Sequence, residues 1–454
     1  MRRRRGRWRR PWRSRSQRWR RPRRPSALSQ DVGVGAGLDP EPRTTTLSNG
    51  VRVVSDAMPH ARSVTTGVWV SVGGRDEAPA LAGASHFLEH LFFKGTEARS
   101  ARSIAEAVDA VGGDMNAFTA REHTAFVTRL PAAHWRLGVE LLGDILSAPA
   151  LRPHEIDAER EVILEELWAA LDTPEDRVHT LSMEALFPDH PLGREVLGDE
   201  GTVRSMTRDD ILGFFETHYR PANLVVAAAG RVDHDELCAA VEERLGGGEG
   251  GSPPQRHAPE PEVDSLRTHR RKGEQVHVVL GWRGLPVDHD DRYALHVADQ
   301  VLGGGSSSRL FQAIREERGL AYSVYSWVSS YSDAGLLGIY AGTSPGRSAQ
   351  LIDALEAEIE GMLEGGVTAD EVRVAVGYLT GATELGLEDS GSRMTRLGRM
   401  LLSTGTVLSI DEQLDRLHAV TVDDVDRVLR SVLTTPRAVA AVGPVDTKRL
   451  ARAV

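Results

Sequence analysis

The chain has 454 residues, which is long enough for two or more domains with separate hydrophobic cores. Its formal net charge is −10, but residues 2–24 contain 14 arginines and no acidic residue, so the remainder carries a net charge of −24. No run of about 18 apolar residues occurs, so no transmembrane helix is expected, and the N-terminus lacks the apolar segment of a secretory signal. The single cysteine, Cys238, excludes an intramolecular disulfide and a cysteine-ligated zinc site, and a reducing bacterial cytoplasm is the expected location.

Residues 1–40 form an Arg-rich tail with interspersed tryptophans. Such a leader resembles an organellar transit peptide, although Pro11, Pro22 and Pro25 interrupt an amphipathic helix. Arginine with tryptophan can also bind nucleic acid or an anionic membrane through charge and stacking. A disordered extension is the favoured interpretation, because the strong preference for arginine over lysine suggests a GC-rich bacterial genome and argues against the organellar option.

Periodicity and turn signals then predict the elements of the first half in chain order. They are a hairpin over 44–54, a strand over 63–72, helices over 84–93 and 103–111, strands over 115–119 and 124–130, helices over 135–146 and 153–168, a helix from about 207, and a closing strand over 223–229.

The helix over 84–93 contains a motif for metal chemistry. Positions i, i+3 and i+4 of a helix share one face, which brings His86, Glu89 and His90 together. The rest of this helix is apolar, so the polar stripe is expected to be buried and to need partners. Two imidazoles one turn apart suit a zinc ion, with Glu89 beside the open position, as in the inverted H-x-x-E-H motif.

A catalytic zinc site of this kind needs a third protein ligand. The helix that begins at Pro153 places Glu159 and Glu166 on its apolar stripe, where two carboxylates are costly unless a cation receives them. Glu166 is therefore the predicted third ligand, and Glu159 is predicted to orient a ligating histidine.

The pattern resembles the pitrilysin or insulinase family of zinc peptidases. Glu166 stands 76 positions after His90. The sequences of segments 83–96 and 159–164 are close to those of the mitochondrial processing peptidase β subunit and its bacterial relatives. The likeness runs from about Thr45 to the C-terminus. It implies one zinc ion per chain, with Glu89 as the general base.

The second half repeats the first after a Gly/Pro-rich segment. Residues 421–425 and 437–446 mirror 207–211 and 224–233, which indicates a duplicated domain. The predicted fold class is α+β, with two homologous α/β-sandwich domains, each a mostly antiparallel sheet flanked by helices. The predicted boundaries are 41–245 for the metal-binding domain, 246–270 for a flexible linker and 271–454 for the second domain. There, His296-Val297-Ala298-Asp299-Gln300 replaces the metal motif, and His296 is interpreted as a structural remnant.

The resemblance also assigns roles to residues outside the zinc motif. Arg315 and Tyr322 match an arginine–tyrosine pair that would stabilise the negative charge developing on the substrate. The edge strand would bind peptide backbone through Asn116, Ala117 and Phe118. The loop of Gly303, Gly304 and Gly305 would guide the peptide, although a simple turn explains it equally well.

The expected function is a zinc-dependent endopeptidase that acts on peptides and unfolded segments. The resemblance implies a homodimer enclosing a chamber, in which the Arg315–Tyr322 pair of one copy could serve the zinc of the other. No membrane partner is expected, and nucleic acid only through the tail. The alternatives are a non-catalytic assembly subunit of the same fold, disfavoured because all three ligands and the base are present, and a nucleic-acid-binding protein acting through its tail.

Overall fold

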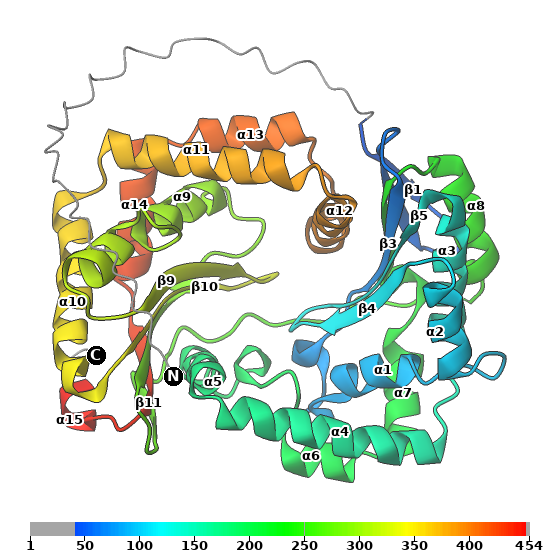
Figure 1. Ribbon diagram of the computed structural model, residues 1–454, viewed down its shortest axis with the longest axis horizontal. Helices are drawn as coiled ribbons and strands as arrows, with labels where there is room; N and C mark the ends of the chain where they lie inside the picture. Colours follow the sequence, from blue (N-terminus) through cyan, green and yellow to red (C-terminus); the bar gives the residue numbers. More distant parts are fainter. Residues whose placement is uncertain (1–40, 249, 451–454) are drawn as a thin grey trace, which may run out of the picture. The chain divides into compact units, whose positions relative to one another are not determined.

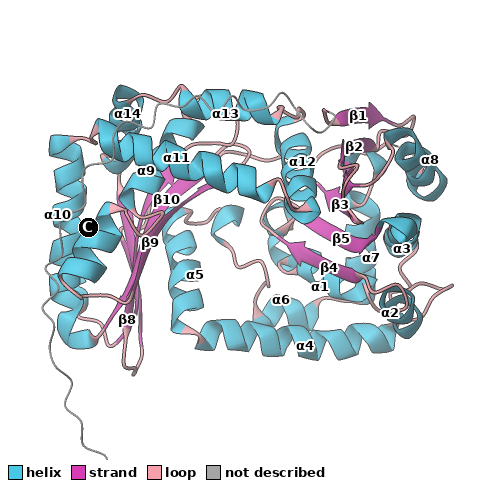
Figure 2. Cartoon of the chain, turned by 45° about the horizontal axis from the view of Figure 1, so that its top comes forward, coloured by secondary structure: helices cyan, strands magenta, loops and turns pink. Residues whose placement is uncertain are grey.

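The computed structural model of the protein describes residues 41–248 and 250–450, which lie within one compact unit. The Arg-rich tail predicted at residues 1–40 lies outside the described residues. The described chain folds into two sheets, each flanked by helices (Figures 1 and 2). None of its helices combines the length and the apolar composition needed to cross a membrane.

The first sheet has six strands in the order β1-β2-β6-β3-β5-β4. Only β2 and β6 run parallel. The central strand β3 is almost wholly buried, whereas β4 shows the alternating exposure of an edge strand. The bounds are β1 Arg43–Thr46, β2 Arg52–Ala57, β3 Ser63–Val70, β4 Asp114–Thr119, β5 Thr124–Pro131 and β6 Leu224–Gly230.

The helices of the first half begin where capping signals stand. Thr207 forms a capping box at the start of α7, Ser100 caps α2, and Pro153 occupies the first turn of α4. The bounds are α1 Ala84–Phe92, α2 Ala101–Asp109, α3 Trp135–Ser147, α4 Pro153–Asp172, α5 Pro174–Leu186, α6 Glu200–Ser205, α7 Arg208–His218 and α8 His234–Leu245.

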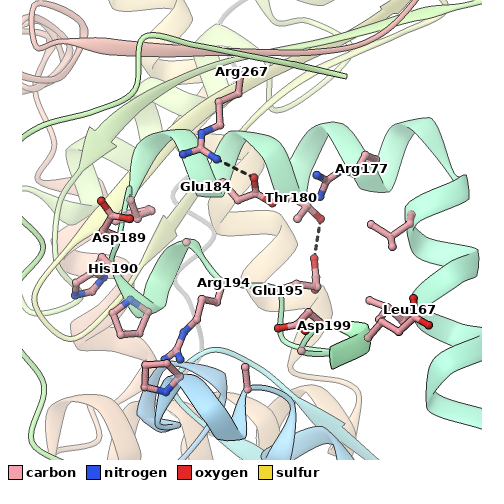
Figure 3. A pocket seen from close by; sticks show the side chains of 18 residues that line it. Leu167, Arg177, Thr180, Glu184, Asp189, His190, Arg194, Glu195, Asp199 and Arg267 are labelled. Carbon is pink, nitrogen blue, oxygen red and sulfur yellow. Dashed lines mark hydrogen bonds and ion pairs between the residues drawn. The ribbon is translucent and has the colours of Figure 1, made fainter. Parts of the chain in front are cut away.

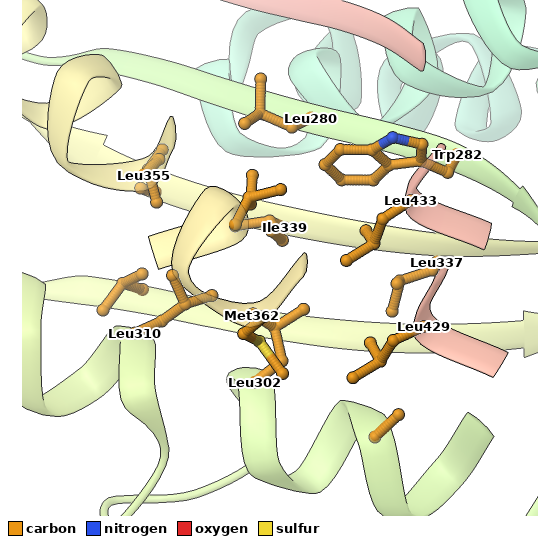
Figure 4. Packing of buried hydrophobic residues seen from close by; sticks show 14 of the residues in the cluster. Leu280, Trp282, Leu302, Leu310, Leu337, Ile339, Leu355, Met362, Leu429 and Leu433 are labelled. Carbon is orange, nitrogen blue, oxygen red and sulfur yellow. The ribbon is translucent and has the colours of Figure 1, made fainter. Parts of the chain in front are cut away.

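The second sheet has five strands in the order β7-β11-β8-β10-β9, and only β7 and β11 run parallel. Its core includes Leu280, Trp282 and Ile339 of the sheet, packed against helix residues such as Leu355 and Leu429 (Figure 4). The bounds are β7 Leu266–Arg270, β8 Val276–Gly284, β9 Ser323–Ser330, β10 Gly335–Thr343, β11 Arg437–Gly443, α9 Arg292–Leu302, α10 Ser348–Gly365, α11 Ala369–Gly386, α12 Ser390–Thr404, α13 Ile410–His418, α14 Val422–Leu433 and α15 Thr447–Leu450, with a π-helix at Phe311–Glu317.

The two sheets share one topology, which confirms the predicted fold class. Strands β2-β6-β3-β5-β4 of the first half correspond in order and direction to β7-β11-β8-β10-β9 of the second. The predicted linker over 246–270 is too long, because residues 266–270 form β7. The predicted flexibility also does not extend along the whole linker, since Arg256 forms an ion pair with Asp76 at 2.8 Å and its side chain is only 16% exposed.

The halves exchange helices. Helix α12 packs on β6, β3 and β2 of the first sheet, and α5 packs on the corresponding strands β11, β8 and β7 of the second (Figure 1). Met394 and Leu397 of α12 are buried against Trp69, while Leu186 of α5 is buried against Leu336. Each sheet therefore has one face covered by a helix from the other half of the chain.

A buried ion-pair network also joins the halves. Arg75, whose side chain is 2% exposed, contacts Glu122 at 2.6 Å and Asp333 of the β9–β10 turn at 2.7 Å. Its guanidinium also donates to the carbonyl of His257 at 2.6 Å. Two turns and the linker therefore meet at one arginine.

Candidate metal centre

The start of α1 is determined by a buried carboxylate. Glu77 accepts hydrogen bonds from the backbone N–H groups of Gly83 and Ser85, both at 2.7 Å. Gly83 has φ of 95°, which favours glycine, and a Cβ there would lie 2.8 Å from the carbonyl oxygen of Leu197. Burial raises the pKa of Glu77 to about 7 despite these hydrogen bonds. No sequence pattern marked Glu77, because only the folded loop brings it to the helix.

Three predicted ligands converge on one point. The Nε2 atoms of His86 and His90 lie 3.6 and 3.4 Å from Oε2 of Glu166, which comes from α4. Among residues 41–248 and 250–450, this is the only group of three or more His, Cys, Asp or Glu side chains with ligand atoms within 4.8 Å of one another. The side chains are 12%, 17% and 45% exposed, so Glu166 is more open than its place on the apolar stripe predicted.

The donor set fits a zinc ion. Ligand atoms about 2.0–2.2 Å from a tetrahedral zinc lie roughly 3.3–3.5 Å from one another, close to the separations from Glu166. Burial, together with the neighbouring His90, lowers the pKa of His86 to about 4, so its imidazole is neutral and has a lone pair to offer a metal. Its buried Nδ1 has no hydrogen-bond partner among the described residues.

Glu159 lies behind the ligands, where the sequence predicted it. Its Oε2 is 3.1 Å from Nδ1 of His90, and its Oε1 is 2.6 Å from Nζ of Lys94. A carboxylate at Nδ1 favours the proton on that nitrogen and leaves Nε2 free to bind a metal. Lys94, to which no sequence pattern assigned this role, pairs with the second oxygen.

Glu89 lies on the same face of α1 as His86 and His90, and a residue of the edge strand β4 holds its side chain. Thr119 of β4 donates a hydrogen bond to Oε2 of Glu89 at 2.5 Å. Burial raises the pKa of Glu89 above its usual value, against the opposing effect of this hydrogen bond. Oε1 has no hydrogen-bond partner in the described chain and can meet a substrate or solvent proton.

The predicted peptide-binding residues belong to the edge strand β4. Residues alternate across a strand, so Phe118 is on the opposite face from Thr119, where its ring packs 5.5 Å from Trp69 and 5.9 Å from His123. Asn116 accepts a hydrogen bond from the backbone N–H of Ala117 at 2.9 Å. The outer edge of β4 has no strand partner among the described residues.

Arg315 and Tyr322, the residue pair predicted in the second half, contact each other. The guanidinium of Arg315 stacks 4.7 Å from the ring centroid of Tyr322, and Tyr322 is 82% exposed. Within the described chain, no hydrogen bond or ion pair joins either residue to His86, His90 or Glu166. The structure brings the pair together but does not connect it to the metal centre of the same chain.

The glycine loop and the degenerate motif are packed against β9. A Cβ on Gly303 would lie 2.4 Å from the backbone nitrogen of Ser326, so this position needs glycine, and Gly304 and Gly305 adjoin the buried Gln300. Asp299 accepts a hydrogen bond from the Ser326 hydroxyl at 2.5 Å, and burial raises its pKa to about 6. These contacts give the loop a structural role.

A separate cavity of about 560 Å³ lies alongside α4 and α5 (Figure 3). It is lined by Leu167, which follows Glu166 in the chain, and by polar side chains paired with one another. Thr180 donates to Glu195 at 2.6 Å, and Arg267 contacts Glu184 at 3.1 Å. None of the three converging ligands lines this cavity.

The fold and the site together define a metallopeptidase-like protein, and comparison with known proteins gives its family. Residues 52–200 match the model of the insulinase family, peptidase family M16, and residues 205–378 match that of the peptidase M16 inactive domain. The chain belongs to peptidase family M16.

Similar sequences and structures agree with this assignment. The chain is 44% identical over 419 residues to an uncharacterized zinc protease of Streptomyces coelicolor, covering 90% of this chain and 91% of that one. It is 38% identical over 400 residues to the uncharacterized zinc protease YmxG of Bacillus subtilis, covering 88% and 97%. A protease from Helicobacter pylori has the same fold, with a TM-score of 0.83 at 23% identity and coverage of 89% and 100%.

Proposed function

We propose that the protein is a zinc-dependent endopeptidase that hydrolyses peptides and unfolded segments, with one zinc ion held by His86, His90 and Glu166. The observation that carries the proposal is the convergence of these three side chains, from two helices far apart in the sequence, with Glu89 on the same face of α1 as the two histidines. The names of the relatives as zinc proteases support the same metal.

A zinc ion held by His86, His90 and Glu166 would supply a Lewis acid for the scissile carbonyl and for the attacking water. Glu89 accepts the proton of that water at Oε1 and passes it to the leaving amine, while Thr119 holds Oε2. Burial raises the pKa of Glu89 above its usual value, a shift in the direction that helps a carboxylate accept a proton.

The edge strand supplies binding that is largely independent of sequence. An extended peptide can add to β4 through backbone hydrogen bonds at Asn116, Ala117 and Phe118. A folded protein has few free extended segments to offer, so peptides and unfolded chains are the proposed substrates.

The remaining parts of the proposal concern assembly and location. Because no hydrogen bond or ion pair within the described residues joins Arg315 or the exposed Tyr322 to His86, His90 or Glu166, we propose a homodimer in which this pair stabilises the transition state at the partner's metal centre. The bacterial cytoplasm is the proposed location, as expected for a chain with a single cysteine.

The first test separates metal binding from catalysis. Glu89→Gln should retain about one zinc per chain by metal analysis, since residue 89 is not a ligand, and should reduce hydrolysis of a generic unstructured peptide by at least about 10²-fold because the proton acceptor is lost. Removing zinc from the wild type with a chelator should abolish activity, and adding zinc should restore it.

The matched control is Glu106→Gln on the exposed face of α2, which should behave as the wild type. Wild-type turnover by the Glu89→Gln protein would exclude the assigned base. If the purified wild-type protein has neither stoichiometric metal nor peptidase activity, the proposed function is wrong.

A further inference from the structure

Helix α11 of the second half exposes apolar side chains along one face. Of the large hydrophobic side chains exposed in the described chain, three belong to this helix: Val374 is 37%, Tyr378 55% and Leu385 72% exposed. At about 100° per residue, these three positions fall within about 40° of one another around the helix axis. Exposed apolar side chains that cluster in this way mark an interaction surface, whereas scattered ones do not.

The spacing of these residues is that of a helix-pairing seam. With Gly381, which lies on the same face, they stand at intervals of four, three and four residues. Alternating intervals of three and four are typical of the a and d positions of a heptad, where a second helix packs. Val374, Tyr378, Gly381 and Leu385 are therefore termed the α11 seam, which extends about 16 Å along the helix.

The seam is separate from the face by which α11 packs in its own chain. Val372 is buried, and Val376 and Leu379 pack against the core of the second sheet. These three positions lie on the side of the helix roughly opposite the seam. Folding of the single chain therefore does not explain why the seam is apolar.

Two glycines of α11 are also unexplained by packing within the chain. A Cβ at Gly377 or Gly381 would meet no atom of the described chain within 4 Å beyond the adjoining helix backbone. Glycine in a helix interior is destabilising relative to alanine, and close approach of another surface is a common reason for it. At Gly381 such a surface would lie directly over the seam.

The seam is complementary to a second copy of itself in antiparallel orientation. A two-fold axis midway between Tyr378 and Gly381 places each Tyr378 over the partner's Gly381, so that a large ring meets the smallest residue. The same axis places each Val374 opposite the partner's Leu385, because the seam is symmetric about its midpoint. Each contact then occurs twice, as in an isologous interface.

The charges beside the seam fit the same arrangement. Arg373 and Glu384 lie on one flank of the seam, near its two ends, and the antiparallel pair places Arg373 within about 3 Å, along the helix axis, of the partner's Glu384. Among the described residues, the side chain of Glu384 has no hydrogen bond or ion pair, and Arg373 pairs only with Asp370, which is also exposed. A parallel pair would instead place like charges side by side.

We propose that α11 is a docking surface for α11 of a second copy of this chain, with the two helices antiparallel. The choice of a second copy rests on the homodimer of the proposed function, whereas the seam and its flanking charges do not depend on it. A single helix pair is a small interface, so a dissociation constant in the micromolar range is expected.

The antiparallel orientation agrees with the proposed sharing of residues between copies. The end of α11 leads into α12, which packs on the first sheet (Figure 1). Antiparallel pairing sets the beginning of α11 in one copy beside the end of α11 in the other. The second half of each copy is thereby brought toward the first half of its partner, as a shared Arg315–Tyr322 pair requires.

Sedimentation velocity over a range of protein concentrations measures the association. Tyr378→Ser combined with Leu385→Ser should raise the dissociation constant at least about tenfold, because both side chains become buried only in the pair. Both are mostly exposed in the single chain, so thermal unfolding should show an intact fold. The matched control is Val162→Ser, an exposed apolar residue of α4 outside the seam, which should associate as the wild type does.

A charge exchange tests the antiparallel register. Arg373→Glu and Glu384→Arg should each weaken the association, since each places like charges together across the interface. The two substitutions combined in one chain should restore most of the wild-type affinity, because the exchanged charges pair again. These differences should shrink as salt is raised.

Four outcomes would overturn the inference. They are a wild type that stays monomeric at every concentration, an association that survives the double serine substitution, and a charge exchange that associates as weakly as the single reversals. The fourth is seam substitutions that leave association unchanged but weaken binding of an unstructured peptide to the Glu89→Gln protein, which would assign the seam to substrate.

Zinc content and peptide cleavage are measured on the same preparations, so that the two proposals fail separately. A monomer that binds zinc and cleaves peptides would refute the α11 docking surface and the homodimer but leave the proposed peptidase in place. A protein that associates through α11 without metal or activity would refute the peptidase and leave the docking surface intact.

Discussion

A buried side chain behind the proposed metal ligands shows how single residues shape this site. Glu159 is only 7% exposed, and burial of a carboxylate is costly unless it is paired. The partners are His90 and Lys94, so the charge that orients the imidazole is itself neutralised. The spacing of histidines and glutamates predicted this arrangement around Glu159, whereas Lys94 and Thr119 could not be predicted because their roles depend on approach between separate segments.

Glu159→Gln should weaken zinc binding about 10- to 100-fold without removing a ligand. The amide keeps the size of the side chain but loses the negative charge that holds the proton on Nδ1 of His90 and pairs with Lys94. Competition against a chromophoric zinc chelator measures the affinity. Glu161→Gln, exposed on the same helix, is the matched control and should not change it. Equal affinities of the Glu159→Gln and wild-type proteins would contradict the orienting role.

Local sequence signals predict the helices and strands of this fold better than they predict the contacts between these elements. Capping boxes at Thr207, Thr368 and Thr421 stand at helix starts, and the edge character of β4 agrees with its alternating exposure. Strand β7 was not predicted, and for the helix at Phe311–Glu317 the π geometry was not predicted. A π-helix has no distinct propensity pattern, and β7 is a five-residue strand with few apolar side chains whose stability depends on pairing with β11.

One capping residue gives a pH-dependent contribution to stability. Glu371 completes the capping box of Thr368 at the start of α11 and accepts two hydrogen bonds from Arg309, at 2.6 and 2.9 Å, which lower its pKa from 4.5 to about 2. Because the folded pKa is the lower one, the stabilisation is present above pH 4.5 and is lost as the pH falls toward 2.

Glu371→Gln should therefore lower the free energy of unfolding by about 1–2 kcal/mol at pH 7, after allowance for solvent screening. The difference from the wild type should largely disappear near pH 2.5. Urea unfolding at both values measures it, with Asp370→Asn, an exposed neighbour, as a control that should change stability by less than about 1 kcal/mol. A difference that is unchanged by pH would rule out the ion pair as its source.

At the scale of the whole molecule, the internal repeat predicted the duplication of the sheet, and the structure shows the same strand order twice. The exchange of α5 and α12 was not predicted. An apolar stripe on a helix indicates that one face is buried but not which sheet buries it, and both sheets present similar strands of small and β-branched residues. Which sheet a helix covers is decided by contacts between residues far apart in the sequence, and these form only in the tertiary fold.

The proposed dimer makes a prediction about mixed assemblies. Neither Glu89→Gln nor Tyr322→Phe should be active alone, but a hybrid dimer of the two has one complete site if Tyr322 serves the partner's metal centre. After exchange of subunits, an equal mixture should recover about one quarter of wild-type activity, because about half of the dimers are hybrids with one working site of two. Mixing Glu89→Gln with itself is the control. No recovery, despite subunit exchange shown by a fluorescent label, would place the pair within its own chain.

The reciprocal placement of α5 and α12 has a consequence for how this protein could be divided. Cutting the gene within the linker would produce two polypeptides. Each would expose an apolar face of its sheet and would carry a helix, α5 or α12, that packs on the sheet of the other polypeptide. Neither product would be a self-sufficient module. If they are synthesised together, the two fragments should associate by exchanging these helices. The duplicated chain is therefore expected to fold as one cooperative unit.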